Sequence, residues 1–160
     1  MASPRSIGTL AVIVILSACV AVAEDLAGVE EVIRATNTDY IQLFPEGDVD
    51  KLMRLYVEDA VLIPPDAPTI DGADAVRASW TAFFSEWSVI EATSIIDEII
   101  VGGDWAWSRG HYRETNQRKS DGEIVIEGGR FSSIWRKQPD GSWRIARDMW
   151  NSDGSVETVP

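Results

Sequence analysis

The chain has 160 residues, a formal net charge of −12 from 26 acidic and 14 basic side chains, and only one cysteine and one histidine. This length is that of a single domain, and a hydrophobic content of 45% is sufficient for a buried core. The acidic charge argues against a nucleic-acid partner, because phosphate contacts need clustered Lys and Arg. One cysteine excludes an intramolecular disulfide, and with one histidine it argues against a structural zinc site. We therefore expect neither a metal nor a cofactor.

The first residues have the pattern of a secretory signal peptide, in which an apolar run follows Arg5 and small residues follow the run. Two cleavage sites are open. The A-x-A sequence Ala21-Val22-Ala23 predicts a signal peptide over residues 1–23, whereas Leu16-Ser17-Ala18-Cys19 resembles a bacterial lipobox, after which Cys19 would carry a lipid. Cys19 can equally be a small apolar residue of the signal. Both cleavages predict an exported protein, periplasmic or secreted, that meets a membrane only through a lipid anchor.

The first half of the mature chain predicts three helices. Apolar residues at helical spacing run from Leu26 to Phe44, where a Pro-Glu-Gly sequence ends the helix. Asp48 caps a short second helix, and residues 60–63 predict a strand. The third helix begins near Asp71, and its apolar stripe consists of Val76, Trp80, Phe83, Phe84 and Trp87.

The second half predicts an antiparallel meander of four strands over residues 92–101, 105–117, 124–137 and 143–150. Alternating apolar residues mark the strands, and Gly- and Asp-containing turns separate them. The polar residues after Asn151 predict a frayed end, with 154–160 as a tail. Helices followed by an antiparallel sheet indicate an α+β domain over residues 24–153.

Particular segments within this order carry a family resemblance. They are Leu55-Tyr56-Val57-Glu58-Asp59-Ala60-Val61, Pro64-Pro65, Ile70-Asp71-Gly72, Trp135-Arg136-Lys137 and the stretch from Asp140 to Asn151. With these segments the chain resembles the nuclear transport factor 2-like superfamily, in its SnoaL-like or ketosteroid-isomerase-like branch. The resemblance implies a cystatin-like cone, in which a curved antiparallel sheet wraps around three N-terminal helices, encloses an apolar pocket and commonly forms a homodimer. Members isomerise, cyclise or dehydrate small substrates or only bind ligands or partners, so the fold does not name the reaction.

The chain departs from the steroid isomerases at both catalytic acids of that branch. Pro64 stands where counting along the chain places the catalytic aspartate, and Asp66 lies two residues away in a proline-rich loop. The second acid should lie near residues 130–133, which contain no carboxylate. Steroid isomerisation by the known machinery is therefore disfavoured.

Asp148 is the first candidate for acid–base chemistry, because it lies in an otherwise apolar last strand. A carboxyl group inside an apolar cone would have a raised pKa and could act as a general base or acid. The alternative is a structural ion pair of Asp148 with Arg147, Arg130 or another arginine, which would hold neighbouring strands in register.

His111 is the second candidate, since its side chain titrates near neutral pH. Alternation places it on one strand face with Trp105, Trp107, Arg109 and Arg113. If this face turns inward, the residues would surround an apolar or anionic ligand. If it turns outward, they form a dimer interface or a solvated surface, and we favour this second arrangement.

Tyr40 is the third candidate, as a hydrogen-bond donor into the cavity, although it could simply anchor the first helix. The expected pocket wall consists of Tyr56, Trp80, Phe84, Trp107, Arg113, Trp135 and Trp150.

Three functions follow. The first is an exported domain that binds a small apolar or aromatic molecule. The second is a cofactor-independent isomerase, dehydratase or cyclase with Asp148 as general base. The third is a lipid-anchored interaction module that uses an exposed sheet face.

Overall fold

The computed structural model describes residues 26–159, and their side chains as far as Gly154. The expected signal peptide, both cleavage sites and Cys19 lie outside the described residues. Within them, a helix over residues 26–42 precedes eight further elements. These are α2 (Val49–Met53), β1 (Tyr56–Ile63), β2 (Ile70–Asp71), α3 (Ala73–Glu86), β3 (Trp87–Gly102), β4 (Trp105–Arg118), β5 (Ile124–Lys137) and β6 (Trp143–Val159).

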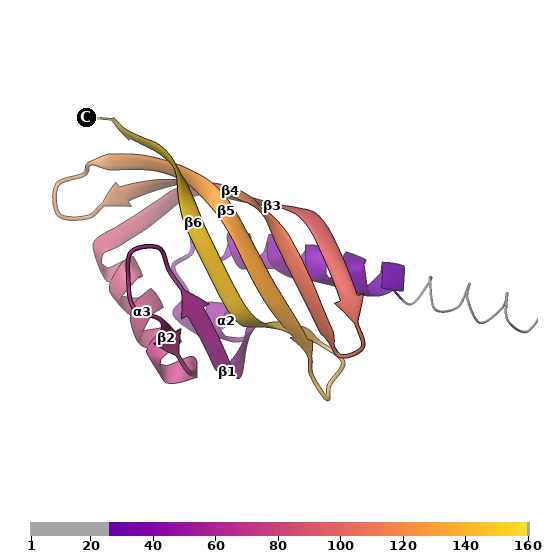
Figure 1. Cartoon of the computed structure of the whole chain (residues 1–160). Helices are drawn as coiled ribbons and strands as arrows, with labels where there is room; N and C mark the ends of the chain where they lie inside the picture. The colour runs from indigo at the N-terminus through magenta and orange to yellow at the C-terminus, as the bar shows by residue number, and fades with distance from the viewer. Residues whose placement is uncertain (1–25, 160) are drawn as a thin grey trace, which may run out of the picture.

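The strands form one curved sheet in the order β2-β1-β6-β5-β4-β3, with the helices gathered on one side of it (Figure 1). β3 to β6 pair with their sequence neighbours in the antiparallel sense, as the meander predicts, whereas β1 runs parallel to β6. The α+β fold expected from the sequence is confirmed.

The structure differs from the sequence pattern at two strand boundaries. β3 begins at Trp87, which the helical spacing assigns to the third helix, because Trp87 already pairs with Arg118 of β4. β6 continues past Trp150 to Val159, which pairs with Ile124 at the start of β5. The predicted end of this strand is therefore too early, since polar residues at a sheet end can still satisfy their backbone groups by pairing.

The local signals for the two shorter helices act as expected. The Asp48 side chain accepts a hydrogen bond from the backbone N–H of Lys51 and so caps α2. In α3, Val76 and Trp80 are buried. Trp80 packs edge-on against Phe44 at 5.3 Å between ring centroids, which fixes α3 against the end of the first helix.

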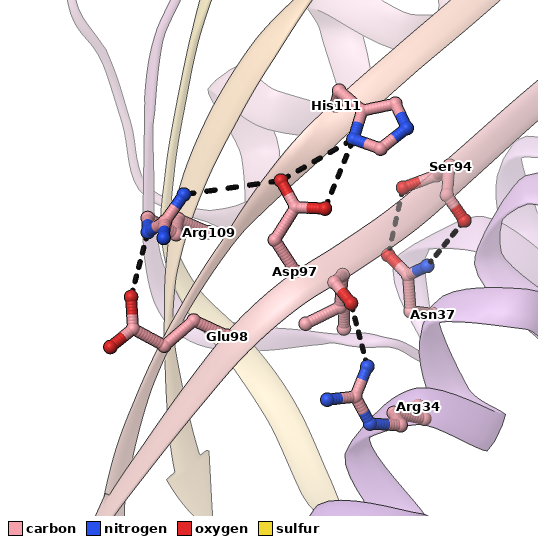
Figure 2. Close-up of polar contacts among 8 residues, drawn as sticks. Arg34, Asn37, Ser94, Asp97, Glu98, Arg109 and His111 are labelled. Atoms are coloured by element: carbon pink, nitrogen blue, oxygen red, sulfur yellow. Dashed lines mark hydrogen bonds and ion pairs between the residues drawn. The ribbon is translucent and has the colours of Figure 1, made fainter.

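Polar contacts fasten the first helix to β3 (Figure 2). Arg34 Nη1 donates to the backbone oxygen of Ile96 at 2.7 Å, next to a shift in the β3–β4 register between Ile96 and Glu98. One turn further on, Asn37 donates to the Ser94 backbone oxygen and accepts from the Ser94 hydroxyl, both at 3.2 Å. Because Ile33, the residue before Arg34, is also fully buried, the helix is held against the inner face of the sheet.

Candidate functional site

A cavity of about 140 Å³ lies between the first helix, α3 and the inner face of β3 to β6. Half of its lining side chains are aromatic, namely Tyr40, Phe44, Trp80, Phe83, Tyr112, Phe131, Trp135 and Trp150. The polar lining residues are Asn37, Ser94, Ser133, Glu114, Glu127 and Asp148. An apolar cavity of roughly 150 Å³ accepts a benzene ring, so the space here suits a ligand built on about one ring.

Two glycines make room for the aromatic wall. Gly110 on β4 is paired with Phe131, and Gly129 on β5 is paired with Tyr112. A Cβ atom at Gly110 would come within 2.6 Å of the Phe131 ring, and one at Gly129 within 2.8 Å of the Tyr112 ring. Each ring thus covers the backbone of the neighbouring strand, which only glycine allows.

Asp148 is brought into the cavity by the alternation of β6. Its side chain is 8% exposed, and Oδ1 accepts a hydrogen bond of 2.7 Å from the Ser133 hydroxyl on β5. Burial raises the pKa of Asp148 to about 6, although the bond from Ser133 acts in the opposite direction. Arg147 instead donates to the backbone oxygens of Asp59 and Ala146. Within residues 26–159, Ser133 is the hydrogen-bond partner of Asp148, and no arginine lies within ion-pair distance of its carboxylate.

Glu114 and Glu127 are two further carboxylates of the cavity wall, and they face each other as direct partners across β4 and β5. Burial and, to a smaller extent, the charge of the nearby Glu127 raise the pKa of Glu114 to about 7, although the hydrogen bond from Asn116 acts in the opposite direction. Burial also raises the pKa of Glu127. Their contacts to Asn116 Nδ2 are long, at 3.4 and 3.5 Å, so the amide stabilises both charges only weakly.

Tyr40 reaches the cavity from the first helix, and its hydroxyl lies 3.0 Å from that of Tyr56 on β1. Burial is the main cause that raises the pKa of both phenols well above the usual value, so both stay protonated. Two hydroxyls that share one hydrogen bond have one hydrogen left over. When Tyr56 donates to Tyr40, the Tyr40 hydrogen is free for a ligand.

The strand register places the carboxylates at two ends of the cavity. Asp148 is paired with Ser133 and, through it, with Ser108 of β4, whereas Glu114 lies six residues further along β4. Six residues correspond to about 20 Å of extended strand, which the curvature of the sheet shortens. Asp148 and Glu114 both raise the pKa of Tyr40 through their charge, so this phenol lies between the two ends.

The predicted cavity residues divide into three groups. Tyr40, Trp80, Trp135, Trp150 and Asp148 line the cavity. Tyr56 and Phe84 pack behind the wall, where Phe84 stacks on Trp80 at 6.0 Å. The remaining predicted residues, His111, Trp107 and Arg113, lie on the outer face of β4.

The structure does not bring His111, Trp107 and Arg113 to the cavity, and it turns their strand face outward, which is the orientation that we favoured. The reason is the alternation of β4, whose even-numbered side chains, including the fully buried Ser108, point inward. Trp107 donates to the Ser132 hydroxyl at 2.8 Å. His111 Nδ1 lies 3.2 Å from Asp97 Oδ1, as Figure 2 shows, and its side chain is 53% exposed.

Sequence reasoning missed Ser133 and both glutamates. A signal for Glu114 existed, because it continues the even-numbered row of β4 beyond Tyr112. Glu127 could be found only from the register of two strands, since the length of the connecting turn decides its partner.

Residues 26–159 meet neither the requirements of a metal site nor those of a membrane-spanning helix. Three or more metal-ligating side chains do not come together anywhere in this part of the chain. Over the same residues, every helix is too short or too polar to cross a membrane.

Comparisons with known proteins agree with this architecture. The family model of the SnoaL-like domain matches residues 37–147, which is more than half of the chain. The chain belongs to the SnoaL-like domain family. A search of curated proteins found no significant match.

Many solved structures share the fold of this SnoaL-like chain. A ketosteroid isomerase-like protein from Erwinia carotovora atroseptica is 25% identical with a TM-score of 0.71, over 78% of this chain and 95% of that one. A nuclear transport factor 2-like superfamily protein from Salmonella enterica is 21% identical with a TM-score of 0.70, over 79% and 92%. A Catenulispora acidiphila protein in complex with S-DNPA is 13% identical with a TM-score of 0.66, over 79% and 95%.

Proposed function

We propose that this SnoaL-like domain binds a small, largely apolar ligand in the aromatic cavity and that Asp148 exchanges a proton with it. The observation that carries the proposal is the burial of the Asp148 carboxyl group in the cavity wall, together with its raised pKa. Its carboxylate is 8% exposed, lines the cavity, and is held by Ser133 at one oxygen. With a pKa of about 6, it is mostly ionised at neutral pH and close enough to it to take up and return a proton.

Tyr40 supplies the complementary group. Its neutral phenol can donate to an oxygen of the ligand while Asp148 takes a proton from carbon. Proton removal by a carboxylate, assisted by a hydrogen-bond donor, is the first step of an isomerase, dehydratase or cyclase.

The binding half of the proposal is tested by filling the cavity. Ile41 lines it from the first helix, so Ile41→Trp should abolish the calorimetric binding of 2-phenylethanol, whereas Ile90→Trp, at a position 50% exposed on β3, should leave it unchanged. Binding that survives Ile41→Trp would place the ligand outside the cavity.

The proton-transfer half is tested with phenylacetone, a small ketone whose α-hydrogens exchange with D₂O. The wild-type protein should accelerate this exchange, with a rate that rises as Asp148 ionises near pH 6. Asp148→Asn should lower the accelerated rate at least ~100-fold, which is the lower range for a general base. An equal rate in the two proteins would overturn the assignment of Asp148.

The outer face of the sheet favours a second role, self-association, and we propose that two copies pack through it. Ile95, Ile100, Ile134 and Met149 are 37–57% exposed, and they share this face with Arg109. The acidic and basic side chains of the same face allow a second copy to form complementary pairs. Light scattering should show a dimer for the wild type and a monomer for the double variant Ile95→Arg, Ile100→Asp.

A further inference from the structure

The cavity contains negative charge that the protein itself does not balance. Three of the lining residues are carboxylates, and none of the described lining residues is a lysine, arginine or histidine. Ion pairs within residues 26–159 lie elsewhere, on outer surfaces. An unpaired carboxylate is costly to bury, and here Asp148 is buried while Glu114 and Glu127 are partly buried, so three in one cavity need a physical account.

The pair of Glu114 and Glu127 is the most unusual part of this charge. Like charges directly opposite each other on neighbouring strands destabilise a sheet. Among the residues whose side chains are described, only Asn116 Nδ2 lies within hydrogen-bond distance of both glutamates, at 3.4 and 3.5 Å.

The side chain of Asn116 is itself in an unfavourable environment. The residue is 3% exposed, and its buried Oδ1 lacks a hydrogen-bond partner within the described part of the chain. The amide is therefore turned so that its donor faces the two glutamates, while its acceptor stays unsatisfied. A group of opposite charge bound beside the two glutamates would offset their repulsion, which the single amide donor of Asn116 does only weakly.

The walls next to the two glutamates are aromatic. Tyr112 precedes Glu114 by one inward-facing position on β4, and the next row of the sheet holds Phe131 and Trp150. Aromatic faces attract cations, and quaternary and other organic ammonium groups are held in this way. A hard metal ion instead needs six or more oxygen ligands, which these rings do not supply.

We propose that the ligand is an organic cation, whose ammonium group lies against Glu114 and Glu127 and whose apolar body extends along Tyr112, Phe131 and Trp150 toward Asp148. This inference rests on the proposed binding function and names the chemical class of its ligand. The ammonium group would supply the charge that the cavity lacks at the end formed by Glu114 and Glu127.

Three probes with the same apolar body test the inference by calorimetry at pH 8. They are 2-phenylethylamine, 2-phenylethanol and phenylacetate, which differ mainly in charge. We expect the amine to bind at least about tenfold more tightly than the alcohol, and phenylacetate to bind most weakly. Glu114→Gln and Glu127→Gln should each weaken amine binding at least about tenfold and leave alcohol binding unchanged. Glu91→Gln, an exposed position on β3, is the charge-matched control and should bind the amine as the wild type does.

The outcomes separate this inference from the function on which it rests. If the alcohol binds as tightly as the amine and Ile41→Trp abolishes both, the cavity binds ligands but its preference for cations is overturned. If none of the three probes binds, the proposed function fails together with the inference.

If the glutamine variants do not fold, the pH dependence of amine binding to the wild-type protein provides a second test. The titratable groups that face the site are Glu114, Glu127, Asp148, Tyr40 and Tyr112, with Tyr56 behind Tyr40 and Asp153 near Tyr112. The tyrosines stay protonated, so only the carboxylates change charge between pH 5.5 and pH 8. Amine affinity should fall at least about tenfold from pH 8 to pH 5.5 while alcohol affinity stays constant. A constant amine affinity would overturn the inference.

Discussion

The two faces of the sheet use acidic residues in opposite ways. On the outer face, Asp97 lies 3.2 Å from His111 and 3.9 Å from Arg109, and Glu98 accepts a bond of 2.7 Å from Arg109 (Figure 2). On the inner face, Glu114 accepts from Asn116 and Asp148 from Ser133, and neither carboxylate has a cationic partner among the described residues. Because burial makes a lone charge costly and water makes it cheap, the charges of the inner face destabilise the fold, while the outer pairs contribute little to its stability.

Substituting a glycine of the inner face by alanine tests how closely the strands and rings of this face pack. Gly129→Ala should lower the free energy of unfolding by about 3 kcal/mol, because the added Cβ meets the backbone oxygen of Asn151 and lies 2.8 Å from the Tyr112 ring. Urea denaturation measures the effect. Gly102→Ala on β3 is the matched control, since its Cβ has no atom within 4 Å, and its change should be under about 0.5 kcal/mol.

Replacing Glu114 should show how much its negative charge lowers the free energy of unfolding. The pKa rises from 4.5 to about 7 on folding, so the protein loses stability as pH rises through this window. The loss amounts to up to about 3 kcal/mol, at roughly 1.4 kcal/mol per unit. Glu114→Gln should therefore be more stable than the wild type at pH 8, with the difference vanishing near pH 4. Equal stability at both pH values would show that water or a rearrangement already neutralises Glu114.

Asp148→Asn should have a similar but smaller effect. A pKa raised from 3.8 to about 6 again means that the ionised carboxylate destabilises the fold, by up to about 3 kcal/mol above pH 6. The new amide must itself be satisfied, which reduces the expected gain to about 2 kcal/mol at pH 8. Thermal unfolding at pH 4 and pH 8 measures the difference. A variant that is less stable at pH 8 would mean that Asp148 has a stabilising charged partner after all.

A substitution on the outer face should change the free energy of unfolding least. Arg109→Gln removes the contacts to Asp97 and Glu98, whose side chains are 39% and 43% exposed. Exposed ion pairs of this kind contribute up to about 1 kcal/mol, so we expect a loss of about 0.5 kcal/mol that decreases in high salt. A loss as large as the gain of Glu114→Gln would remove the contrast between the two faces.

Most of the fold could be predicted from the sequence because its signals are local. The alternation of β4 and β5, the cap at Asp48 and the stripe around Trp80 each depend on residues close in the chain. The parallel pairing of β1 with β6 could not be predicted from local signals, since Leu62 and its partner Asp148 are far apart in the sequence.

The candidate site was predicted in part. Asp148 could be identified because a carboxylate in an otherwise apolar strand has few explanations besides a buried pair or a functional group. His111 was misplaced as a catalytic group for a different reason. Its chemistry is suited to catalysis, but its face of the strand turns to solvent.

The sequence by itself determined the acidic charge, the order of helices and strands, and the two alternating faces of each strand. The tertiary structure alone decided which face of β4 turns toward the helices and which carboxylates share the cavity. The physical reason is that a period of two defines two faces without naming the buried one. Burial is a property of what packs against a face, and the pairing of Glu114 with Glu127 depends on the register set by the turn between their strands.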